Sequence, residues 1–96
     1  MISEHNPVFY FTYILQSETT KGLYIGYTSD IERRLKEHNE STGKYTSGKG
    51  KWVILFYKKF DNKTLAISLE HNLKKWKSKK KVLEWIEKEK YANNRE

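Results

Sequence analysis

Hydrophobic residues gather in three short runs that predict β-strands. The runs cover residues 8–16, 23–28 and 52–60, and each is rich in aromatic and β-branched side chains. Apolar residues occupy both alternating sets of positions, which is typical of strands that are covered on both faces. Only the short polar segment 17–22 separates the first two runs, so these strands are predicted to form an antiparallel hairpin.

Tyrosines on the predicted hairpin fall into two sets. Tyr10 and Tyr13 are three residues apart, so their side chains point to opposite faces of the sheet, and the same holds for Tyr24 and Tyr27. If the connecting loop has an even number of residues and the strands have no bulge, Tyr13 and Tyr24 share a face. The sequence alone leaves this register open.

The segment after the second strand predicts a helix. Ser29 and Glu32 have the spacing of a capping box, which marks the helix start. At about 100° per residue, Arg34 and His38 border the apolar stripe of this helix, whereas Arg33 lies on the opposite side. We therefore expect Arg34 to be held at a site and Arg33 to be a solvated surface charge.

Residues 40–50 are rich in Ser, Thr, Gly and Lys and have no hydrophobic period, which predicts a loop and ends the helix near Asn39. The run 43–49 nearly matches a phosphate-binding nucleotide loop. However, Gly50 stands where that motif needs Ser or Thr, and the run precedes a strand instead of a helix. We therefore predict only a basic loop close to a phosphate backbone.

Two helices are predicted after the third strand, the first of them capped by Asp61 or Asn62. Its apolar stripe follows the helical period and consists of Leu65, Leu69, Leu73 and Trp76. A short final helix is marked by Val82, Trp85 and Ile86, and residues 93–96 are expected to fray.

Two side chains near this stripe have competing interpretations. We interpret Trp76 as a core residue and not as a platform for base stacking, because it continues the stripe. Glu70 lies beside the stripe, and periodicity alone favours a solvated glutamate paired with Lys74 four residues later.

Length and composition predict one soluble domain, 1–96, with a core from about residue 8 to residue 90. Apolar residues make up only 36% of the chain, but the 15% of aromatic residues can close a small core. The absence of cysteine excludes disulfides, thiolate metal sites and thiol nucleophiles, and fits a cytoplasmic location. No leader and no membrane-spanning run are recognisable, so we expect no membrane partner.

The net charge of +7 comes from 19 Lys and Arg against 12 Asp and Glu. Such a balance favours a polyanionic partner, because each neutralised phosphate releases condensed counterions. The lysines cluster in the loop before the third strand and after the second helix. The predicted nucleic-acid contacts are Lys44, Lys49, Lys51, Lys74 and Lys77.

The remaining polar residues are suited to phosphoryl chemistry. His5, His38 and His71 lack zinc-type spacing, and the chain has no serine elbow of the kind used in Ser-His-Asp catalysis. Tyrosine hydroxyls, an arginine and a carboxylate remain, which can respectively activate water, stabilise charge on phosphate oxygens and bind a divalent cation.

The order of these motifs resembles the GIY-YIG endonuclease superfamily. The motifs are Phe11-Thr12-Tyr13, Tyr24-Ile25-Gly26, Arg34 in a capped helix and Leu69-Glu70 in a later helix. The run 23–39 is the most specific match, and the resemblance extends over residues 9–86. The chain is most similar to small stand-alone bacterial members, which are related to the nuclease domain of an excision-repair enzyme and so to DNA repair.

The resemblance implies an α+β fold, with a three-stranded antiparallel sheet flanked by helices in the order β-β-α-β-α-α. It also implies metal-dependent hydrolysis of DNA phosphodiester bonds, with DNA preferred over RNA. Tyr13 and Tyr24 would be the catalytic tyrosines, one of them activating water, Arg34 would stabilise transition-state charge, and His38 would orient water or phosphate. Glu70 would bind one divalent cation, Mg²⁺ or Mn²⁺. A free tyrosine with a pKa of about 10 is a poor base, so neighbouring groups must assist it.

Two departures from the motif keep an alternative open. Phe11 and Thr12 replace the first two residues of the leading triplet, and Val82 stands near the position where larger relatives place an asparagine. The alternative is a nucleic-acid-binding module of the same fold with little or no catalysis, and a third hypothesis is a basic protein-interaction domain. The residues alone do not decide between DNA and RNA, and strandedness, specificity, pathway and oligomeric state are not predicted.

Overall fold

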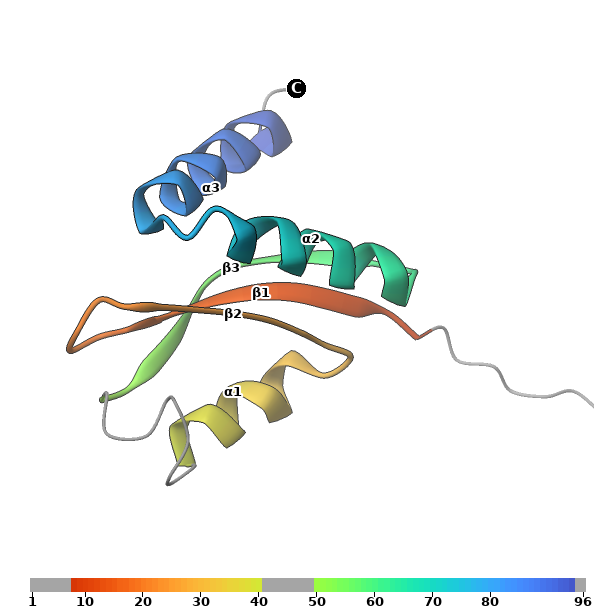
Figure 1. Ribbon diagram of the computed structural model, residues 1–96. Coiled ribbons are helices and arrows are strands. Elements are labelled where there is room, and N and C mark those ends of the chain that lie inside the picture. The colour runs from red at the N-terminus through yellow and green to blue at the C-terminus, as the bar shows by residue number, and fades with distance from the viewer. Residues whose placement is uncertain (1–7, 41–49, 95–96) are drawn as a thin grey trace, which may run out of the picture.

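A three-stranded sheet lies between one helix on one face and two helices on the other (Figure 1). The computed structural model describes residues 8–40 and 50–94. The elements are β1 (Tyr10–Ser17), β2 (Leu23–Thr28), α1 (Ile31–Glu40), β3 (Trp52–Phe60), α2 (Lys63–Lys75) and α3 (Lys79–Asn94). Their order, β-β-α-β-α-α, and the antiparallel pairing confirm the predicted fold class.

The strand order β2-β1-β3 makes β1 the central strand. In the hairpin, Leu15 pairs with Tyr24 and Tyr13 pairs with Gly26. Paired residues of antiparallel strands share a face, as do residues two apart on one strand. Tyr13 and Tyr24 therefore point to the same face, as the condition of an even loop without a bulge predicted.

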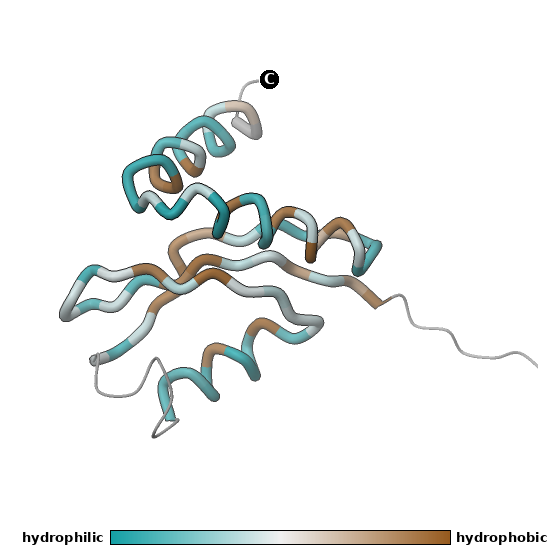
Figure 2. The backbone as a smooth tube through the Cα atoms, in the orientation of Figure 1, coloured by the Kyte–Doolittle hydropathy of each residue, from teal (hydrophilic) through white to brown (hydrophobic). Residues whose placement is uncertain are grey.

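The sheet separates two hydrophobic clusters. On the α1 face, Tyr13, Leu15 and Trp52 form the buried cluster. On the opposite face, Ile14 packs with buried residues of α2 and α3. Figure 2 shows hydrophobic positions of α1 on its sheet-facing side. Each layer therefore docks through its own apolar surface, and β1 contributes to both.

A bulge in β3 adjusts the sheet to these two clusters. The pairing with β1 passes from Ile14–Phe56 to Leu15–Ile54, so Leu55 is the extra residue. As a result, the consecutive residues Leu55 and Phe56 both pack against the α2–α3 cluster, while Ile54 packs against the α1 cluster.

The start of α1 differs from the prediction. The cap is Asp30, whose Oδ1 accepts a hydrogen bond from the Arg33 backbone N–H at 3.1 Å, and not Ser29. Thr28 supports the turn, because its Oγ1 accepts a hydrogen bond from the Asp30 N–H at 3.1 Å. The predicted capping box was therefore one residue early, since the carboxylate next to Ile31 satisfies the helix N-terminus.

The predicted stripe of α2 is confirmed at Leu69 and Leu73, which pack in the core, and is wrong at its two ends. Leu65 and Trp76 are 51% and 38% exposed, whereas Ala66 and Glu70 are buried. Ala66 is buried because α2 lies close to the central strand β1 at this residue. Thr12 Oγ1 on β1 donates a hydrogen bond of 2.7 Å to the Ala66 carbonyl. The small side chain of alanine allows this contact. The interpretation of Trp76 as a core residue is wrong, because Trp76 is exposed.

The last helix is longer than the short helix predicted, with 16 residues. Val82 and Ile86 are buried as expected, and the Trp85 ring lies edge-on to Phe56 with centroids 5.3 Å apart. None of the helices in residues 8–40 and 50–94 combines the length and the apolar character needed to span a membrane.

Replacing Asn62 with Ala tests the local stability of α2. Asn62 Oδ1 accepts a hydrogen bond from the Leu65 N–H at 3.2 Å and so caps the helix, as predicted. We expect Asn62→Ala to lower the free energy of unfolding by about 1 kcal/mol, which corresponds to a fall of roughly 4–8 °C in melting temperature. The control is Asn72→Ala at an exposed position of the same helix, which should not lower the melting temperature, because alanine favours a helix interior more than asparagine does.

Candidate functional site

Tyr13 is the centre of the candidate site, and glycine at position 26 makes room for it. The Tyr13 side chain is 2% exposed and lies opposite Gly26 on β2. A Cβ atom at residue 26 would lie 2.7 Å from the Tyr13 hydroxyl and 2.9 Å from Cζ, closer than such atoms approach. The phenol ring therefore lies across the backbone of β2, and only glycine allows this approach.

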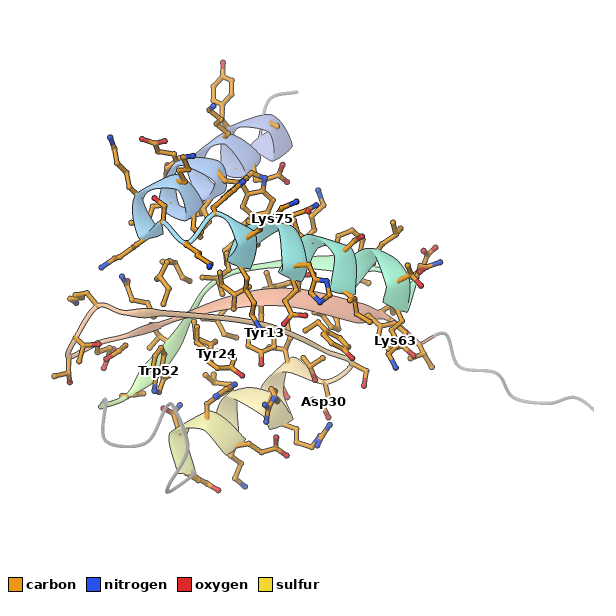
Figure 3. All side chains as sticks on the ribbon, in the orientation of Figure 1. Tyr13, Tyr24, Asp30, Trp52, Lys63 and Lys75 are labelled. Atoms are coloured by element: carbon orange, nitrogen blue, oxygen red, sulfur yellow. The ribbon has the colours of Figure 1, made fainter. Side chains whose placement is uncertain are left out.

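His38 and Tyr24 complete an aromatic group with Tyr13. The Tyr13 hydroxyl and His38 Nε2 are 3.1 Å apart and hydrogen bonded. The Tyr24 ring stacks on the Tyr13 ring with centroids 6.3 Å apart, and it meets the His38 ring edge-on at 4.4 Å. Figure 3 shows Tyr13 and Tyr24 between the sheet and α1. Three of the residues predicted for the site are thus in mutual contact.

Glu37 fixes the two neighbouring arginines of α1. Arg34 donates from Nη1 to Glu37 Oε1 at 2.8 Å, and Arg33 donates from Nη1 to Oε2 at 3.0 Å. The Arg33 side chain is 59% exposed and that of Arg34 is 38% exposed, as helix phase predicted. Glu37 was not among the predicted site residues, although its spacing of three residues from Arg34 and four from Arg33 is that of helical ion pairs.

The charge of Arg34 acts on the tyrosine and histidine beside it. Burial raises the pKa of Tyr13 to about 12, and the Arg34 guanidinium partly offsets this rise. Burial and the same guanidinium lower the pKa of His38, with Glu37 acting in the opposite direction. At neutral pH the phenol therefore keeps its proton and the imidazole is uncharged.

Glu70 approaches the sheet from the other helical layer. It is 9% exposed, and its Oε2 atom forms an ion pair of 2.6 Å with Lys74 Nζ. The negative charge of Glu70 contributes to the raised pKa of Tyr13, so the carboxylate interacts electrostatically with the phenol. The pairing with Lys74 is as periodicity predicted, but the glutamate is buried and not solvated.

The donor set around Glu70 fits an open cation site. Within the described ranges, no group of three or more His, Cys, Asp or Glu side chains could enclose a metal ion. Mg²⁺ commonly binds through one or two carboxylates and fills its remaining positions with water and substrate phosphate. A single buried carboxylate is therefore compatible with such a cation and incompatible with a closed structural site such as that of zinc.

The lysines predicted to contact nucleic acid lie in separate parts of the chain. Lys44 and Lys49 fall outside the described residues. Lys51 is exposed directly before β3, and Lys77 is exposed after α2. Lys74 is exposed too, but its ammonium group pairs with Glu70.

Trp52 also borders the site, although it was not among the predicted site residues. It is 1% exposed, and its ring meets the Tyr24 ring edge-on with centroids 6.4 Å apart.

The chain is similar to known proteins in both sequence and structure. A family model described as the GIY-YIG catalytic domain matches residues 9–92. A UPF0213 protein of Haloquadratum walsbyi is 38% identical over 74 residues, which cover 76% of this chain and 82% of that protein. A UPF0213 protein of Oceanobacillus iheyensis is 39% identical over 83 residues, which cover 83% and 95%. The solution NMR structure of a UPF0213 protein from Bacillus halodurans superposes with a TM-score of 0.54 at 31% identity, covering 82% of this chain and 83% of that one.

The lowered pKa of His38 predicts a pH-dependent stability. The pKa of His38 in the folded chain lies below its value of about 6.5 in the unfolded chain. At pH values between the two, the unfolded chain binds more protons than the folded chain. The free energy of unfolding therefore falls as the pH falls through this window. In urea unfolding at pH 7.5, 6.5 and 5.5, the wild type should lose stability more steeply than His38→Gln. Equal losses in both proteins would contradict the burial of a neutral imidazole.

Proposed function

The chain belongs to the GIY-YIG family of nucleases, and from this premise we propose that it is an endonuclease that hydrolyses DNA phosphodiester bonds with the help of one divalent cation. The observation that carries the proposal is the hydrogen bond between Tyr13 and His38 next to the charge of Arg34. A buried phenol with an uncharged proton acceptor has the components of a path that removes a proton from water.

Tyr13 acts as a relay in this proposal and not as a free phenolate. Its pKa of about 12 leaves almost no phenolate at neutral pH. The attacking water donates to the Tyr13 oxygen while Tyr13 donates its own proton to His38 Nε2. The water oxygen forms a bond to phosphorus and the bond to the leaving oxygen breaks. The leaving oxygen takes a proton from solvent, and the proton removed from the attacking water resides on His38 until it passes to solvent.

Tyr24 has a separate role because it is differently placed. Its ring contacts both Tyr13 and His38, while its side chain is only partly buried. We assign Tyr24 to orienting the substrate phosphate beside the relay. The relay role goes to Tyr13, because its hydroxyl is hydrogen bonded to His38 Nε2 at 3.1 Å.

Arg34 and Glu70 provide charge on the two sides of the relay. Arg34, oriented by Glu37, stabilises negative charge that develops on the non-bridging phosphate oxygens, an effect of about 3 kcal/mol in comparable sites. Glu70 would hold Mg²⁺ or Mn²⁺, which when bound polarises the phosphate and the leaving oxygen. Lys74, which pairs with Glu70 in this structure, would then be available to bind a substrate phosphate.

One observation favours the binding-module alternative. Val82, which stands near the asparagine position of larger relatives, is 2% exposed and belongs to the hydrophobic core. Because this position supplies no polar group to a substrate, the alternative of nucleic-acid binding with little or no catalysis is retained as the second candidate.

Plasmid nicking separates the two candidates. With Mg²⁺ or Mn²⁺ we expect nicking by the wild type, a loss of about 100-fold in Arg34→Ala and no metal-dependent nicking in Glu70→Gln. The matched controls are Arg33→Ala, the exposed neighbour on α1, and Glu84→Gln, an exposed glutamate on α3. Both controls should retain activity within a few-fold of the wild type.

The outcomes against the proposal are equally specific. Wild-type activity in both Arg34→Ala and Glu70→Gln would contradict the site. No nicking with either metal, together with DNA binding that weakens steeply with salt, would favour the module.

A further inference from the structure

A groove of about 480 Å³ lies at the edge of the sheet next to the candidate site. Its floor is apolar and consists of Leu23, Ile25, Leu73 and Val82. Tyr24 also lines it, so one residue of the edge strand β2 borders both the groove and the aromatic group around His38, with its ring on the α1 face and the side chains of Leu23 and Ile25 on the α2 face. The volume falls in the range of about 300–1,000 Å³ that is usual for sites of small organic groups.

The rim of the groove is cationic. Lys74, Lys77 and Lys79 line it, with Lys74 in an ion pair with Glu70, and no acidic residue is among the described residues that line the groove. The first turn of α3 likewise contains no acidic residue among those described. An apolar floor beneath a positive rim is complementary to a group with an apolar face and an attached negative charge, which is the chemistry of a nucleotide.

Lys77 has a backbone conformation that does not favour lysine. Its φ angle is 49°, in the left-handed region, and its N–H donates to the Lys74 carbonyl at 3.2 Å at the end of α2. Glycine is the residue that usually takes this position after a helix. The chain thus places a long cationic side chain at the mouth of the groove at some cost in stability.

We propose that this groove takes up the base of an unpaired nucleotide adjacent to the scissile phosphate, while the rim lysines bind the flanking phosphates. This inference rests on the proposed nuclease function and specifies its substrate class. A base inside an intact duplex has both faces stacked and cannot enter a groove in the protein, whereas an unpaired base is already available. The preferred substrate is therefore DNA with an unpaired nucleotide, and intact duplex is the poorer substrate.

Three matched DNA substrates test the proposal without altering the protein. They are an intact duplex, the same duplex with one bulged nucleotide, and the bulged duplex with an abasic residue at the unpaired position. Binding is measured by fluorescence anisotropy with the wild-type chain, and cleavage is measured with Mg²⁺. We expect at least tenfold tighter binding and faster cleavage for the bulged base than for the other two substrates.

The two readouts distinguish failure of the groove from failure of the nuclease. Equal binding and cleavage of the bulged and abasic substrates would overturn the groove proposal while nuclease activity stands. Tighter binding of the bulged base without any cleavage would support the groove and reject the nuclease function. Tightest binding of the intact duplex would overturn the substrate class.

A variant of Lys77 separates its binding role from a structural role. Lys77→Gly removes the charge and relieves the left-handed strain, so it should raise the melting temperature while it weakens binding of the bulged substrate several-fold. It should also reduce the slope of log affinity against log salt by about 0.9. Lys63→Ala, at the opposite end of α2 from Lys75 in Figure 3, is the control and should keep the wild-type slope. An unchanged affinity in Lys77→Gly would overturn the role of the rim.

Discussion

The close packing of Tyr13 across Gly26 is the constraint on which the site depends. Because residue 26 has no side chain, the phenol ring reaches over β2 and its hydroxyl meets His38 on α1 at 3.1 Å. Burial then keeps both groups uncharged at neutral pH. The same contact, together with the packing of Ile31 and Leu35, holds α1 against the sheet, so the geometry of the candidate site depends on the docking of the helix.

Much of the fold follows from patterns that can be read in the sequence. The bounds of β2 and β3 agree with prediction because both runs are rich in aromatic and β-branched residues and are flanked by glycine or polar residues. The burial of Ala66 on α2 could not be predicted, since alanine carries a weak hydrophobic signal. Its burial accompanies the hydrogen bond that Thr12 donates to its carbonyl. Asp30 and Ser29 are equally good caps by residue type, and only the backbone turn at Thr28 decides between them.

The candidate site was predictable to a different degree for each residue. Helix phase placed Arg34 and His38 correctly beside the sheet, because both border the apolar stripe of α1. Periodicity assigned Glu70 to the solvent, since its burial depends on the packing of α2 against β1. The groove beside Tyr24 was beyond prediction, because it is formed by segments from β2, α2 and α3 that only the tertiary fold brings together.

The tautomer of His38 tests the central claim most directly. In the proposed relay, the Tyr13 hydroxyl donates to an unprotonated Nε2 atom of a neutral imidazole. In ¹⁵N NMR at pH 7.5, His38 should show a protonated Nδ1 and an unprotonated Nε2, and the Nε2 resonance should move in Tyr13→Phe. A protonated Nε2, or an imidazolium at this pH, would contradict the relay.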